Sequence, residues 1–212
     1  MADWSTNVLS TAAHTIQEEY DNETERDYAL RRKVDILSSG RARVKETAMG
    51  ETRIKRLDWI LENGFSWKRH HFERMFHAKC VTALAKTMMG PDWSTMGAEV
   101  AAERGWDHIS KFVAAMAPRR FGKSVSAAKL VAALAEVLIE FPEGLEFTTY
   151  PIAVFSTGRR ASDALSAYVE GFLQERGMAK YFIKKNSEKI WLQREDKKMT
   201  VQMIFLPSNP DK

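Results

Sequence analysis

The chain has 212 residues, of which 44% are hydrophobic, and its formal net charge is +4. This size and composition allow one domain with a buried core, and the mild positive charge permits a nucleic-acid partner without establishing one. The only cysteine, Cys80, excludes an internal disulfide framework or a zinc site built on cysteines.

Nothing near Asp3 resembles a signal peptide, and the most apolar stretch, 125–141, is broken by three charged residues. We therefore expect a soluble, intracellular chain with no membrane partner.

The first part of the chain, 1–66, is predicted to be a helical extension without a core of its own. Charged residues without proline over 18–37 predict a solvated helix. The segment 53–65 places its apolar residues on one helical face and ends at Gly64, a typical helix stop.

The second part, 67–212, is predicted to be one incomplete α/β domain. It opens with a half-buried helix over 67–89, which Gly90 and Pro91 end. A loop over 91–105, with a short helix at 96–103, leads to a region where strands and helices alternate.

That alternating region predicts a mostly parallel sheet flanked by helices. Its expected strands and helices are 109–116 (strand), 123–140 (helix), 147–157 (strand), 162–176 (helix), and a hairpin of 189–195 with 199–207.

The segment APRRFGKS, 117–124, lies between the first strand and its helix and is typical of a phosphate-binding loop. In such a loop Gly122 leaves room for the phosphate, Lys123 reaches the β- and γ-phosphates, and Ser124 offers a hydroxyl to Mg²⁺. The general pattern has glycine where this chain has Ala117. The alternative is an ordinary turn before an amphipathic helix.

The sequence PRRFGKS, 118–124, resembles the Walker A motif of viral large terminase subunits, the DNA-packaging ATPases of herpesviruses and tailed phages, including the alanine at 117. The stretch 152–165 looks like their segment after the P-loop helix, and 206–212 looks like the stretch before their Walker B strand. The resemblance covers 67–212 and implies a P-loop NTPase fold of the RecA/terminase type.

ATP and Mg²⁺ are the cofactors that this resemblance implies. Arg119 would act with Lys123 in catalysis, as a finger on the γ-phosphate; the alternative is a surface arginine paired with a carboxylate. Arg120 contacts DNA, a neighbouring subunit or only solvent. The implied ATP-binding residues of the loop are Ala117, Pro118, Arg119, Arg120, Phe121, Gly122, Lys123 and Ser124.

Two further sites follow from the resemblance. His71 or Phe72 would recognise adenine, although Phe72 and Phe76 at helical spacing are also typical of a core. Arg159 and Arg160, after the second expected strand, would contact DNA phosphates or another subunit; the alternative is a solvated turn.

The implied function is that of the ATP-binding part of a motor that moves double-stranded DNA into a capsid. Its partners would be the portal protein, the small terminase subunit and further copies in a ring, in the nucleus or cytoplasm of an infected host. The alternatives are a fragment of a superfamily 1 or 2 helicase-like ATPase, and a non-catalytic nucleic-acid or capsid-assembly module.

A Walker B strand is missing from this sequence. The only apolar run after the loop that ends in an acid, 137–140, lies inside the expected helix 123–140. We therefore expect the N-terminal part of an ATPase domain, with an incomplete sheet, no nuclease domain, and little hydrolysis by itself.

Overall fold

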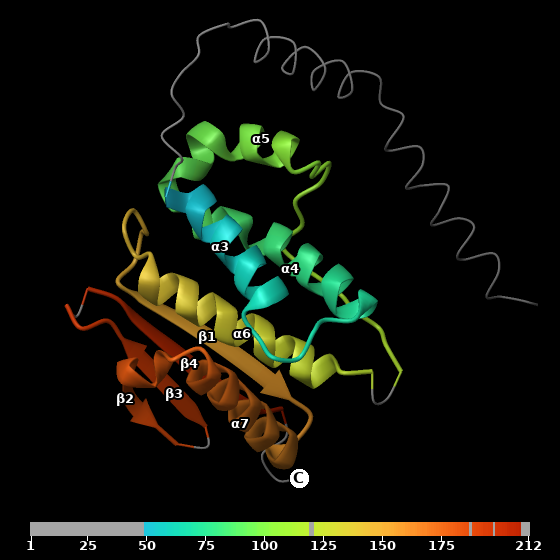
Figure 1. Cartoon of the computed structure of the whole chain (residues 1–212), viewed down its shortest axis with the longest axis vertical. Helices are drawn as coiled ribbons and strands as arrows, with labels where there is room; N and C mark the ends of the chain where they lie inside the picture. The colour runs from blue at the N-terminus through green and yellow to red at the C-terminus, as the bar shows by residue number, and fades with distance from the viewer. Residues whose placement is uncertain (1–48, 119–120, 187, 197, 209–212) are drawn as a thin grey trace, which may run out of the picture. The chain divides into compact units, whose positions relative to one another are not determined.

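The computed structural model describes residues 49–118, 121–186, 188–196 and 198–208. The helix expected over 18–37 lies outside these residues. The described elements (Figure 1) are α3 (Met49–Asn63), α4 (His71–Met89), η1 (Gly90–Asp92), α5 (Trp93–Glu103), α6 (Lys123–Glu140), β1 (Thr149–Ser156), α7 (Arg159–Glu175), η2 (Met178–Tyr181), β2 (Phe182–Lys185), β3 (Lys189–Gln193) and β4 (Thr200–Pro207).

The sheet is mixed, with strand order β1-β4-β3-β2, so the expected α/β fold is confirmed. Among the described strands, only β1 and β4 pair in parallel, while β3 pairs antiparallel with both β4 and β2. The expected hairpin is present: a short turn closes it, with the Arg194 N–H donating to the Met199 carbonyl at 2.9 Å. Strands joined by so short a turn must run antiparallel, so the described sheet is not mostly parallel.

The strand expected over 109–116 is wrong, because this segment joins no sheet. Phe112 and Met116 are 86% and 97% exposed. The hydroxyl of Ser110 donates to the Phe112 carbonyl (2.8 Å) and accepts from the Phe112 N–H (3.2 Å). A serine that binds the nearby backbone in this way competes with the hydrogen bonds of a sheet.

Helix α3 belongs to the same core as the later elements. Its apolar face, which includes Ile54, Leu57 and Ile60, is fully buried, and the helix packs against α4 and α6. It ends where predicted, with the Gly64 N–H donating to the Ile60 carbonyl at 2.7 Å. All of α3 belongs to one compact unit with the later elements, so the expected boundary between 66 and 67 falls inside one core.

Arg53 of α3 is completely buried at the C-terminal ends of two other helices. Its guanidinium donates to the Phe141 carbonyl, at the end of α6, at 2.7 Å, and to the carbonyls of Met88, near the end of α4, and Glu143. Burial lowers the pKa of Arg53 from its ordinary value. An arginine nevertheless remains charged, and a cation is stabilised where helix dipoles end.

Helices α6 and α7 cover one face of the sheet (Figure 1). The strand residues beneath them are apolar and at most 1% exposed: Ile190, Leu192, Val201, Met203 and Phe205. On β1 the alternate side chains, Pro151, Ala153 and Phe155, point to the other face and are exposed. In the part of the chain that the structure describes, we find no helix with the length and hydropathy to cross a membrane.

Candidate functional site

The backbone at Gly122, directly before α6, adopts a conformation that favours glycine. Gly122 has φ +74° and ψ 12°, the left-handed conformation, and its carbonyl accepts from the Ser126 N–H at 2.8 Å. A Cβ on Gly122 would lie 3.4 Å from His70 Nε2 and would also be strained by the positive φ. Helix α6 then begins at Lys123, and the first N–H groups of a helix have no partner within it.

Lys123 closes this loop. Its Nζ donates to the carbonyl of Ala117 at 2.5 Å and to that of Pro118 at 2.6 Å, while the side chain is exposed. An ammonium has three donors, so one remains for another acceptor. Arg119 and Arg120, which complete the loop, lie outside the described residues, and their roles stay predictions.

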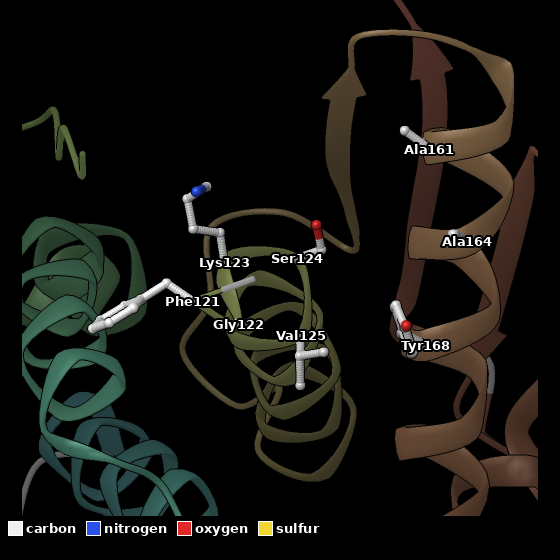
Figure 2. A pocket seen from close by; sticks show the side chains of 8 residues that line it. All are labelled: Phe121, Gly122, Lys123, Ser124, Val125, Ala161, Ala164 and Tyr168. Atoms are coloured by element: carbon white, nitrogen blue, oxygen red, sulfur yellow. The ribbon is translucent and has the colours of Figure 1, made fainter. Parts of the chain in front are cut away.

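A hollow of about 410 Å³ opens beside the loop, between the first turn of α6 and the first half of α7 (Figure 2). This volume lies within the range of small-molecule sites. The residues that line it are Phe121, Gly122, Lys123, Ser124, Val125, Ala161, Ala164 and Tyr168.

The hollow lies at an edge of the sheet where ligands commonly bind. Strands β1 and β4 end together, with the Ser208 N–H donating to the Ser156 carbonyl at 2.7 Å, and α7 begins three residues after β1. Helix α6 starts at the same end, where the arrow of β1 points (Figure 1). The carboxyl ends of parallel strands are the usual place for nucleotide sites in α/β proteins.

Three aromatic rings hold the loop against α4. The Phe121 ring lies edge-on to His70 and Phe72, with ring centroids 5.4 and 5.3 Å apart, and Phe72 also stacks with Phe76 at 6.3 Å. His71, the first residue of α4, is exposed. Neither of the two residues expected to bind adenine, His71 and Phe72, is in the lining of the hollow.

His70 was not predicted as a site residue. Its ring Nδ1 lies 3.5 Å from the Glu73 N–H, and the Glu73 carboxylate accepts from the His70 N–H at 3.2 Å, which caps α4. The spacing of a cap residue and a glutamate three positions later is visible in the sequence, but histidine is not a usual N-cap.

A buried polar cluster fixes the first turns of α6 to α4. His77 is 1% exposed, with Nδ1 3.2 Å from the Arg69 guanidinium and Nε2 2.9 Å from the Ser126 carbonyl. Because arginine only donates, Nδ1 accepts and Nε2 carries the proton that binds Ser126. The ring is therefore neutral, and no short-range sequence signal joins these residues, since His77 and Ser126 are 49 positions apart.

The second part of this cluster is an ion pair. Lys129 Nζ lies 3.3 Å from the Glu73 carboxylate and donates to the Trp67 carbonyl at 3.1 Å. The two charged side chains are 1% and 5% exposed. Together with His77, this pair positions the helix that carries Lys123.

We expect stability to fall in mild acid because of His77. Burial, together with the charges of Arg69 and Lys129 and against that of Glu73, lowers the His77 pKa from 6.5 to about 4. Above pH 6.5 the ring is neutral in both the folded and the unfolded protein, so its contribution to stability is fully present. As the pH falls from 6.5 to about 4, the unfolded protein gains the proton first. The free energy of unfolding is therefore ~2 kcal/mol lower at pH 5 than at neutral pH.

Urea unfolding at pH 7 and pH 5 measures this loss, with His77→Gln as the control because it cannot titrate. A smaller loss in the variant is the expected result. Equal losses in both proteins would mean that other groups cause the acid sensitivity.

The two arginines expected to contact DNA, Arg159 and Arg160, begin α7 and are exposed. Arg159 lies 3.6 Å from the carboxylate of Glu188, which is also exposed. A pair this exposed contributes little stability. Neither arginine is in the lining of the hollow, so their DNA contact stays a prediction.

Among the residues that the structure describes, no group of three or more His, Cys, Asp or Glu side chains is placed to hold a metal. The exposed hydroxyl of Ser124 is the metal-ligand candidate that the loop supplies. Comparison of the chain with protein-family models, curated proteins and solved structures gives no match. The assignment of a function therefore rests on the geometry of the loop.

Proposed function

We propose that the loop 117–124 binds the triphosphate of ATP, as part of a DNA-packaging motor of the large terminase type. The observation that supports this most is the left-handed Gly122 at the start of a long helix, with Lys123 folded over the loop beside a hollow. Free N–H groups and the positive end of a helix dipole favour a phosphate at this position.

Three residues of the loop then have distinct roles. Lys123 would exchange the carbonyls of Ala117 and Pro118 for phosphate oxygens, which are stronger acceptors because they are charged. Ser124 would give its hydroxyl to Mg²⁺, which neutralises phosphate charge when it is bound with ATP. Arg119 would stabilise the γ-phosphate during transfer.

The finer fold and the partners belong to the same proposal. The parallel pair of β1 and β4 beside the loop is what a P-loop NTPase sheet of the RecA/terminase type would contain. Arg159 and Arg160 would contact double-stranded DNA, or a neighbouring subunit in a ring, at a capsid portal of an infected host cell, where the small terminase subunit is a further partner.

A non-catalytic nucleic-acid or capsid-assembly module is the second candidate, and one observation favours it. None of the eight described residues that line the hollow is acidic. Hydrolysis of ATP in such proteins needs a group that positions the attacking water. We therefore expect residues 1–212 to bind ATP with little turnover, and turnover that depends on Lys123 would reject this second candidate.

Lys123→Ala is expected to weaken Mg-ATP binding by about tenfold to a hundredfold, because a charge-assisted hydrogen bond contributes about 1.5–3 kcal/mol. Isothermal titration calorimetry on the full chain measures this change. Lys123 is exposed, so the melting temperature should not change.

Lys111→Ala is the matched control, because Lys111 is exposed and does not line the hollow. Its affinity for Mg-ATP should equal that of the wild type. Absence of binding by the wild type at millimolar ATP, or equal binding by Lys123→Ala, would reject the proposed function.

A further inference from the structure

The hollow beside the loop has two chemically different ends. What these ends would bind depends on the proposed function, in which the loop holds a triphosphate. Lys123 and Ser124 supply an ammonium and a hydroxyl at the start of α6. The opposite wall, on α7, offers two alanines and the ring of Tyr168 (Figure 2). A nucleoside triphosphate has the matching division, with an anionic tail and a flat aromatic base.

The wall on α7 is suited to a flat ring. Ala161, Ala164 and Tyr168 have the spacing that places residues on one side of a helix. The two alanines leave space above the helix, and Tyr168 is 43% exposed, so its ring is available. An aromatic ring packs well on another aromatic ring at this kind of site.

The aromatic residues on α4 are less available. Phe72 is half-buried, with one ring neighbour at 5.3 Å (Phe121) and another at 6.3 Å (Phe76). His70 lies 5.4 Å from Phe121 and caps α4. These rings hold the loop in place, and moving Phe72 to meet a base would take support from Phe121.

We propose that Tyr168 packs against the base of the bound nucleoside triphosphate, and that the aromatic residues of α4 support the loop instead. Among the residues of this wall, only the Tyr168 hydroxyl can form a hydrogen bond from its side chain. The site therefore accepts different bases with similar affinity, because every base offers a flat face for stacking.

The experiment compares Mg-ATP with inorganic tripolyphosphate, which has the anionic tail but no base, by calorimetry on the full chain. Tyr168→Ala should weaken Mg-ATP binding about tenfold and leave tripolyphosphate binding within about twofold, given the usual strength of base stacking. Tyr168→Phe should bind Mg-ATP as the wild type does, because it keeps the ring.

A second pair of variants tests the same wall by filling it. Ala164→Leu should weaken Mg-ATP binding, because the larger side chain occupies the space of the base, and should leave tripolyphosphate binding unchanged. Ala167→Leu adds the same side chain to an exposed position of α7 outside the hollow, and should change neither affinity. Thermal melting of each variant confirms that it is folded.

The outcomes separate this inference from the proposed function. Unchanged Mg-ATP affinity in Tyr168→Ala, or equal weakening of both ligands, would overturn the role of Tyr168 and leave the phosphate loop intact. A selective loss of Mg-ATP in Phe72→Ala, with Tyr168→Ala unaffected, would place the base on α4. If neither ligand binds the wild type, the proposed function fails, and this inference fails with it.

Discussion

Arg53→Met is expected to lower the free energy of unfolding by about 3–5 kcal/mol, because three carbonyls would lose their common donor inside the protein. Arg53 is fully buried, so water cannot readily replace its guanidinium. For a domain of this size the loss corresponds to a decrease of about 10 °C in melting temperature. Urea unfolding and differential scanning calorimetry measure both quantities.

Arg159→Met is the matched control, since its guanidinium is exposed and pairs only with an exposed carboxylate among the contacts described. This variant should change stability by no more than about 0.5 kcal/mol. The stability of Arg53→Lys should lie between those of Arg53→Met and Arg159→Met, because lysine keeps the positive charge but has fewer hydrogen-bond donors. A loss below about 1 kcal/mol in Arg53→Met would contradict the proposed role at the helix ends.

Lys129→Met is expected to cost about 3–5 kcal/mol, since it leaves the Glu73 carboxylate buried without its cation. The loss should also weaken Mg-ATP binding, because Lys129 lies on the helix that starts at Lys123. Chemical unfolding and calorimetric titration measure the two effects.

The double variant Glu73→Gln with Lys129→Met separates charge from packing. Glutamine is neutral and can still accept from the His70 N–H at the start of α4. Removing both charges of a buried pair costs much less than removing one, so the double variant should be more stable than Lys129→Met alone. If the double variant loses as much stability as the two single variants together, Glu73 and Lys129 are not coupled.

The sequence was informative where local rules decide the structure. Helix α6 begins at Lys123 and ends at Glu140, as predicted, because a glycine that adopts positive φ precedes a run of good helix formers. The hairpin of β3 and β4 was also predicted, since its alternating residues and its short turn are sequence neighbours.

Long-range pairing could not be predicted in the same way. Lys129 and Glu136 interrupt an apolar run in the sequence, yet both are buried in α6. Lys129 pairs with Glu73, and Glu136 accepts from Arg176 at 2.7 and 2.8 Å. A sequence pattern shows that such charges exist, but it does not show which distant residue neutralises them.

For the segment 109–116, the sequence predicted a strand that does not form. Its apolar residues suggested burial, but a strand also requires a neighbour that accepts and donates backbone hydrogen bonds. The same limit applied to the hollow: Tyr168 lies 44 positions after Ser124 in the sequence, and only the packing of α7 beside α6 brings them together.

The face of the sheet opposite α6 and α7, which no described element covers, has a consequence for the behaviour of the protein in solution. Phe155 is 67% exposed there, and β1 has β4 on one side and no described strand on the other. Exposed hydrophobic side chains next to unpaired backbone N–H and C=O groups favour association between molecules. Concentrated solutions of this chain should therefore aggregate, and a mild detergent should reduce the aggregation by binding to that surface.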